Sequence, residues 1–332
     1  MSEPSNSVVV SGRIRLARNY YDLPFSSREH PENAKVCVER ACDALHTGTQ
    51  DVYSLFQLKD MPKTARMALM EQHLISRDLL QNSDVGAALI RADHKVSVMV
   101  NEEDHLRIQG LIAGLNLDEA ASEAFQAEGI LENACGFSFD PQLGYLTACP
   151  TNTGTGMRAS LMLHLPVLTL FKQMGNVTQS VAKLGLTMRG IYGEGSEALG
   201  NLYQVSNQVT LGRSEADIIE AVTAVGKQLI DMETTLRERA LTQRATETKD
   251  VIMRSYGILR YAVSMDSKEF MQHWSNLRLG AALEVLPVPL DVADDLLTIA
   301  QDAHARQYAK QHKLDVPAEV ARCLLIQEKL NG

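Results

Sequence analysis

The chain has 332 residues, of which 45% are hydrophobic and 22% charged, so it can bury a sizeable core and is neither disordered throughout nor a coiled coil. Its 32 Lys and Arg against 41 Asp and Glu give a formal net charge of −9, which argues against a broad nucleic-acid-binding surface. Five cysteines without a CxxC pair, and no apolar run near the roughly 18 residues of a membrane span, favour a cytoplasmic protein without membrane contacts.

The first part of the chain mixes short strand patterns with helical ones. Apolar periodicity predicts helices at 31–45 and 116–131. Strands are predicted at 8–10, 87–90, 96–100, 159–165, 186–192 and 202–210. A helix of about thirty residues begins at Ser214, where Asp217 occupies the matching position of a capping box.

From about residue 245 every pattern is helical. The predicted helices are 248–263, 267–273, 291–311 and 318–330. A helical domain packed after an α/β domain is the plain interpretation. We therefore expect an α/β domain over residues 1–240 and a helical domain over residues 241–332.

Familiar nucleotide and hydrolase motifs are missing. The sequence has no GxxxxGK[ST], no GxGxxG after a strand, no HExxH and no GxSxG. Candidate chemistry lies instead in five short segments. The first, SGRIRLARN, places Arg13 and Arg15 on one face of a strand, where two guanidinium groups can bind a polyphosphate. Solvated arginines on an edge strand are the alternative.

The other four segments have equally ordinary alternatives when taken singly. NEEDHLR (101–107) follows a strand and is either a site or a solvated charge run. The loop 144–160 holds Cys149, either an ion-paired thiolate or an inert thiol. The glycine-rich segment 188–201 carries Glu194 and is either a closing loop or a surface hairpin. EQHLIS offers a lone His73, a residue that is more often structural.

Together these segments resemble the phosphagen (guanidino) kinases, and within them most closely the bacterial protein-arginine kinases of McsB type. The resemblance extends from residue 7 to about 285. It is carried by VVVSGRIRLARN, EQHLIS, VNEEDHLRIQ, GYLTACPTNTGTGMRAS, MRGIYGEGSEALGNLYQVSNQ, TLGRSEADI, RSYGILRYA and SNLRLGA. It implies a mainly antiparallel sheet flanked by helices, followed by an all-helical domain, and the missing crossover signals of a parallel doubly wound sheet agree with this.

The resemblance also implies a site for ATP, with Mg²⁺ held mainly through the phosphates and no metal site of side chains. Five arginines would surround the phosphates, and a histidine would lie beside the adenine. The implied nucleotide-binding residues are Ser11, Gly12, Arg13, Ile14, Arg15, His73, Arg107, Arg158, Ala159, Ser160, Leu161, Met162, Arg189, Gly190, Ile191, Tyr192, Gly193 and Glu194. Guanidinium groups of this kind stabilise the charge that spreads over a transferring phosphoryl group.

The implied catalytic residues are Glu103, Glu194 and Cys149. A guanidinium acceptor has a pKa above about 12, so it must be oriented and must lose a proton before its nitrogen attacks phosphorus. Two carboxylates can hold its N–H groups, and one of them can act as general base. A thiolate would add negative charge beside the cation.

Two positions and one segment depart from the family pattern. Gly12 stands where a hydroxyl residue is usual, and Met162 stands where the kinases of small guanidines have a histidine, in agreement with the protein-kinase branch. In the helical domain, the segment Ala318 to Cys323 keeps only Arg322 of the RDxxRA motif. The resemblance therefore leaves phosphoarginine binding by that domain open.

The leading interpretation is a protein-arginine kinase that transfers the γ-phosphoryl group of ATP to arginine side chains of proteins. The alternatives are a kinase of a free guanidino metabolite such as arginine, and a degenerate kinase that acts as a binding adaptor. By the same resemblance, the metabolite kinases have a helical domain of about a hundred residues before the arginine motif. In this chain that motif starts at residue 11. The implied partners are a heat-shock repressor, clients of a Clp protease, a zinc-binding activator protein and a second copy of the chain.

Overall fold

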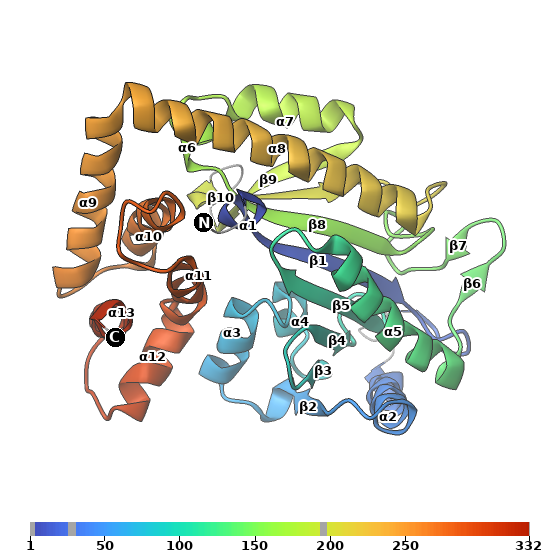
Figure 1. Cartoon of the computed structure of the whole chain (residues 1–332). Coiled ribbons are helices and arrows are strands. Elements are labelled where there is room, and N and C mark those ends of the chain that lie inside the picture. Colours follow the sequence, from blue (N-terminus) through green and yellow to red (C-terminus); the bar gives the residue numbers. More distant parts are fainter. Residues whose placement is uncertain (1–3, 26–30, 193–197, 332) are drawn as a thin grey trace.

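One antiparallel sheet of eight strands forms the centre of the molecule (Figure 1). The computed structural model describes residues 4–25, 31–192 and 198–331. The strand order is β2-β3-β4-β5-β1-β8-β10-β9, and every neighbouring pair is antiparallel. The strands are β1 (Val9–Arg18), β2 (Tyr53–Gln57), β3 (Ala87–Arg91), β4 (Val96–Val100), β5 (Leu106–Ala113), β8 (Met157–His164), β9 (Leu186–Tyr192) and β10 (Ala198–Asn207). The predicted fold class is thereby confirmed.

Long helices cover one face of this sheet. On the opposite face residues 58–79 pack over β3 and β4, and the site lies beside them. Helix α5 packs against β1 and β5, while α8 packs against β8 and β10 (Figure 1). The helices of this part are α1 (Pro4–Val8), α2 (Pro31–Gly48), α3 (Lys63–Glu71), α4 (Arg77–Gln81), α5 (Leu117–Cys135), α6 (Pro166–Leu170), α7 (Met174–Lys183) and α8 (Glu215–Gln243). A 3-10 turn, η1 (Leu58–Asp60), and a small hairpin, β6 (Phe139–Asp140) and β7 (Gly144–Tyr145), complete it.

Strand β1 shows how the alternation of a strand separates core from site. Ile14 and Leu16 are fully buried on the helix-covered face. Arg13 and Arg15, which alternate with them, are only half-buried and lie on the opposite face. Helix α8 begins at the predicted capping box, in which Ser214 and Asp217 bond reciprocally to each other's backbone N–H.

The C-terminal part is helical, as predicted. It consists of α9 (Ala245–Tyr261), α10 (Ser267–Ala282), α11 (Leu290–Ile299), α12 (Asp302–Gln311) and α13 (Ala318–Asn331). The prediction of one helix over 291–311 was wrong, because the chain turns at Ala300 and Gln301. In a continuous helix the carbonyl of Ala300 would accept the N–H of His304. Instead it accepts Nε of the buried Arg322 at 2.6 Å.

A buried polar network joins the helical part to the sheet. Arg278, which is fully buried, donates to the carbonyl of Ser7 at 2.7 Å and pairs with Asp294 at 2.6 Å. Ser275 lies 2.8 Å from both His164 Nε2 and Asn201 Nδ2. Within the described residues, no helix has both the length and the apolar character needed to cross a membrane.

Candidate active site

Four strands bring the predicted arginines to one face of the sheet. Arg13 and Arg15 lie on β1, and the pairing of β1 with its neighbours sets Arg15 opposite Arg158 and Ala17 opposite Arg107. Burial, together with the charges of Arg13, Arg107 and Arg158, holds the pKa of Arg15 well below its ordinary value. Burial and the charges of Arg189 and Arg107 likewise lower the pKa of Arg158. The five guanidinium groups therefore act on one another as a single positive field.

Arg15 is the member of this arginine cluster whose hydrogen bonding is incomplete among the described residues. Nε of Arg15 is buried and has no hydrogen-bond partner among the residues that the structure describes. An unpaired buried donor among like charges is unfavourable in the empty protein. A polyanion such as the phosphates of a nucleotide would satisfy the donor and neutralise the field.

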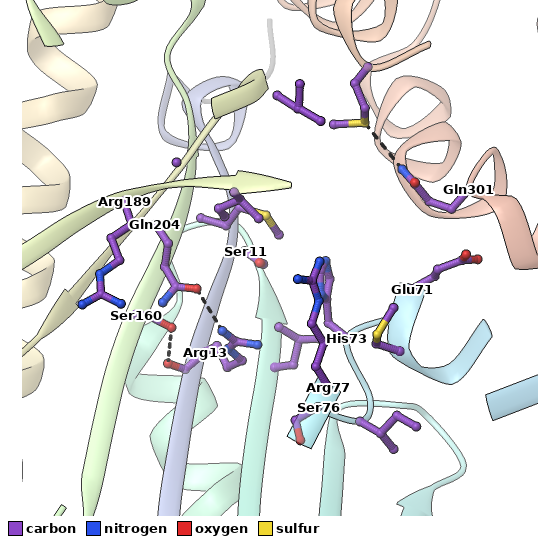
Figure 2. Close-up of a pocket in the computed structure, with 18 of the residues that line it drawn as sticks. Ser11, Arg13, Glu71, His73, Ser76, Arg77, Ser160, Arg189, Gln204 and Gln301 are labelled. Atoms are coloured by element: carbon purple, nitrogen blue, oxygen red, sulfur yellow. Dashed lines mark hydrogen bonds between the residues drawn. The ribbon is translucent and has the colours of Figure 1, made fainter. Parts of the chain in front are cut away.

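A cavity of about 590 Å³ lies beside the arginine cluster (Figure 2). Ser11 and Arg13 line it from β1, and Arg189 lines it from β9. Further predicted residues that line it are His73, Ser160, Met162, Gly190 and Ile191. The volume suits a small ligand such as a nucleotide.

Some predicted nucleotide-binding residues face away from this cavity. Ile14, Ala159 and Leu161 are fully buried among the core residues beneath the helices. A Cβ on Gly12 would lie 3.3 Å from Leu117 of α5, on the same helix-covered face. These four can reach a ligand only through their backbone. The side chain of Tyr192, and the whole of Gly193 and Glu194, lie outside the described residues.

His73 occupies the turn after α3. Its φ is 59°, and Gln109 Nε2 on β5 donates to its carbonyl at 2.7 Å. Burial and the charge of Arg13 lower the pKa of His73 to about 4. The imidazole is therefore neutral at physiological pH, which suits a contact with an uncharged purine ring.

The acidic loop after β4 leaves one carboxylate open. Glu102 is buried and pairs with Arg107 and with the Ser76 hydroxyl. Asp104 is buried and accepts from Asn19 Nδ2 and from the Ala148 N–H, both at 2.6 Å. Glu103 keeps 42% of its side chain exposed, 3.8 Å from Arg107 Nη2. Of the three acids, only Glu103 is placed to meet a substrate.

Electrostatics favours Glu103 as a base. Burial raises its pKa first, and the neighbouring charge of Asp104 adds to this, against the opposing effect of Arg107. A raised pKa brings a carboxylate closer to the range in which it accepts a proton efficiently at neutral pH.

Cys149 is tied to the same loop. The N–H of Ala148, the residue before Cys149, donates to Asp104, the residue after Glu103. Glu103 and Cys149 are therefore the chain neighbours of a hydrogen-bonded pair. Sγ of Cys149 lies 3.0 Å from Thr151 Oγ1, and the thiol interacts electrostatically with Arg158. The structure thus brings the predicted thiol and carboxylate to the arginine cluster.

Several cavity residues are absent from the sequence-based list. Gln204 on β10 accepts from Arg13 Nη2 at 3.0 Å, and Arg77 lines the cavity directly after the EQHLIS segment. Glu71 and Gln301 line it as well (Figure 2). The position of Arg77 beside a recognised motif could have signalled it, whereas no local pattern marks Gln204 or Gln301. Among the described ranges, no group of three or more His, Cys, Asp or Glu is arranged to hold a metal ion.

Residues 36–236 match the family described as ATP:guanido phosphotransferase, C-terminal catalytic domain. The match spans more than half of the chain, so the chain belongs to this family and is an enzyme of its class. The resemblance inferred from the motifs is thereby confirmed.

The C-terminal part matches a second family model, which is more specific than the first. Residues 245–332 match the family described as Protein-arginine kinase McsB C-terminal domain. The chain is 43% identical to the protein-arginine kinase of Caldanaerobacter subterraneus, over 100% of this chain and 99% of that protein. It is 40% identical to the protein-arginine kinase of Geobacillus stearothermophilus, over 98% and 91% of the two chains.

Solved structures agree with the fold. A lombricine kinase is 27% identical with a TM-score of 0.60, over 72% of this chain and 70% of that one. The substrate-free duplicated taurocyamine kinase of Schistosoma mansoni is 24% identical with a TM-score of 0.62. That comparison covers 76% of this chain and 38% of the duplicated enzyme, and it supports the fold alone.

Proposed function

We propose that this chain is a protein-arginine kinase, which transfers the γ-phosphoryl group of ATP to arginine side chains of proteins. The observation that carries the proposal is that the five-arginine cluster lies next to the open carboxylate of Glu103. Within the described part of the chain, Nε of Arg15 in this cluster has no hydrogen-bond partner. The full-length similarity to proteins named protein-arginine kinase supports the same acceptor.

The arginine cluster would bind the nucleotide phosphates, with Mg²⁺ coordinated mainly by the phosphate oxygens. The neutral His73 would contact the purine. Fixed guanidinium groups need no reorganisation when charge develops on the transferring group, so they lower the barrier to transfer.

Glu103 would orient the acceptor guanidinium and accept its proton. As the guanidinium nitrogen forms its bond to phosphorus, the bond from phosphorus to the leaving oxygen of ADP breaks, and the released proton passes to Glu103. The Cys149 thiolate would hold the cationic acceptor. Glu194 remains a proposed second carboxylate.

The cellular setting is part of the proposal. Proteins with accessible arginines, a heat-shock repressor and Clp-protease clients among them, are the proposed substrates in a stress response, and a zinc-binding protein is a proposed activator. The five cysteines, none in a disulfide, support a cytoplasmic location. We further propose a homodimer.

The test incubates the chain with MgATP, an arginine-rich protein and free arginine, and detects acid-labile phosphoarginine on each. Phosphate on the protein in preference to free arginine supports the proposal. Phosphate on free arginine alone identifies a metabolite kinase, and nucleotide binding without any transfer identifies an adaptor.

A further inference from the structure

The helical part forms one wall of the cavity beside the arginine cluster. Figure 2 shows Gln301 at the edge of the helical part, on the side of the cavity away from Arg13 and Gln204. The cavity-lining residues of the helical part are Ser267, Met271, Gln301 and Asp302. A ligand in this cavity would therefore contact both parts of the chain.

One carboxylate from the α/β part binds the N-terminus of α12, the helix that begins at this wall. Glu71, the last residue of α3, accepts from the N–H groups of Ala303 at 2.8 Å and His304 at 3.2 Å. Its Oε2 also lies 2.7 Å from His304 Nδ1. These N–H groups belong to the first turn of α12 and have no partner within the helix. Gln301, at the N-cap position, makes no side-chain cap, so Glu71 supplies it from another domain.

The same short turn connects this cap to the proposed nucleotide contact. Gln72 lies 3.2 Å from His304 Nε2, and His73 lines the cavity. Asp302, directly before the capped residues, is held by the buried Arg322. Residues 71–73 therefore contact α12 on one side and reach the cavity on the other through Glu71 and His73.

We propose that Glu71 is a positioning residue that couples docking of α12 to nucleotide binding. The inference deepens the proposed function, since the ligand is the nucleotide of that reaction. A bound nucleotide, held between the arginine cluster and the wall at Gln301, stabilises the docked α12. By linkage, the docked α12 strengthens nucleotide binding by the same factor.

The first experiment measures MgADP binding to the full chain by calorimetry, for the wild type and Glu71→Gln. An amide can accept only one of the two N–H bonds and turns its own N–H₂ toward the other. We expect the Kd of MgADP to rise about fivefold or more, as for a modest coupling between sites. Unchanged MgADP affinity in Glu71→Gln overturns the proposal.

Glu233→Gln is the matched control. Glu233 also accepts two N–H groups at the start of a helix, from Val167 at 3.1 Å and Leu168 at 2.9 Å, and it bonds Arg237. It does not line the cavity. This variant should lose thermal stability while binding MgADP within twofold of the wild type. An equal loss of affinity in both variants would assign the effect to general destabilisation and refute the coupling.

His304→Ala separates coupling from direct contact, because His304 bonds Glu71 without lining the cavity. It should weaken MgADP binding in the same direction. Hydrogen exchange separates coupling from a purely structural role of Glu71, which would not make the exchange depend on nucleotide. MgADP should slow exchange of the Ala303 and His304 amides in the wild type and much less in Glu71→Gln. The absence of nucleotide-dependent protection in the wild type also refutes the proposal.

These measurements need no phosphoryl acceptor. A wild type that binds MgADP with protection of α12 but phosphorylates no arginine refutes the proposed function and leaves the coupling standing. Arginine phosphorylation with equal MgADP binding by Glu71→Gln and the wild type refutes the coupling alone.

Discussion

Three consecutive acids after β4 serve different purposes because their surroundings differ. Glu102 is neutralised by Arg107, and Asp104 is occupied by Asn19 and Ala148. Glu103 alone faces the site with an exposed side chain. The first prediction follows from this division.

Glu103→Gln keeps the shape of the side chain but removes its charge and basicity. We expect kcat for arginine phosphorylation to fall by roughly two to four orders of magnitude, the range for a general base, with MgADP affinity nearly unchanged. Steady-state kinetics and calorimetry check this, with Glu119→Gln on α5, at an exposed ion pair with Lys95, as control. Near-normal turnover of Glu103→Gln would contradict the mechanism.

The pH profile should report the same carboxylate. Because burial raises the pKa of Glu103, the acid limb of kcat/KM should lie above the ordinary carboxyl value of about 4.3, with activity rising as pH increases through that limb. A raised folded-state pKa also means that folding disfavours the ionised form, so Glu103→Gln should unfold at the same temperature as the wild type or higher at pH 7. An acid limb of kcat/KM at the ordinary carboxyl value would show that Glu103 is not the base that titrates.

Arg15→Met tests the arginine cluster. Its guanidinium is crowded by three like charges, and its Nε is unpaired among the described residues. Removal should leave the ligand-free protein as thermally stable as the wild type or more so, while weakening MgADP binding about 10- to 100-fold, the worth of a charge-assisted hydrogen bond. Thermal unfolding with and without MgADP measures both effects. Full retention of the MgADP-induced stabilisation would exclude Arg15 from the nucleotide site.

At the scale of the elements, the packing of α5 on β5 depends on a missing side chain. A Cβ on Gly110 would lie 2.1 Å from the carbonyl oxygen of Ala120, so backbone would have to move. Gly110→Ala should lower the free energy of unfolding by about 1–3 kcal/mol or more, as overpacking does. Gly129 lies in α5 itself and has open space around it. Gly129→Ala should therefore raise the free energy of unfolding by up to about 1 kcal/mol. Urea unfolding that gave both variants the same sign would refute this account.

Elements with strong local patterns were predicted well, and weakly patterned ones were missed. The helices at 31–45 and 116–131 and the strands at 87–90 and 96–100 all exist, with boundaries shifted by a few residues. Strand β5 was missed for another reason: Leu106 and Ile108 do alternate with Arg107 and Gln109 as in a half-buried strand, but its first residues belong to the charged segment NEEDHLR. The break between α11 and α12 was not predicted, because Arg322, which bonds the carbonyl of Ala300 at the break, lies 22 residues further along the chain.

At the scale of the whole molecule, the buried network around Arg278 joins the helical part to the sheet. Arg278→Ala would remove the ion-pair partner of Asp294 and one of the guanidinium donors to the carbonyl of Ser7, to which Arg237 also donates. We expect a loss of about 3 kcal/mol in unfolding free energy, as when one member of a buried ion pair is removed. Arg254→Ala, at an exposed ion pair with Asp250, should leave the transition unchanged. Equal urea midpoints for the two variants would show that the junction contributes little.

The sequence by itself determined the family, because short motifs are local properties of the chain. The resemblance to that family implied the antiparallel fold with its helical continuation and the five arginines of the candidate site. The tertiary structure decided which acid is open, which strand residues face the core, and that Glu71 and His304, 233 positions apart, join the cavity to the helical part. These features depend on contacts between distant segments, and such contacts follow from how the layers pack rather than from any local pattern of residues.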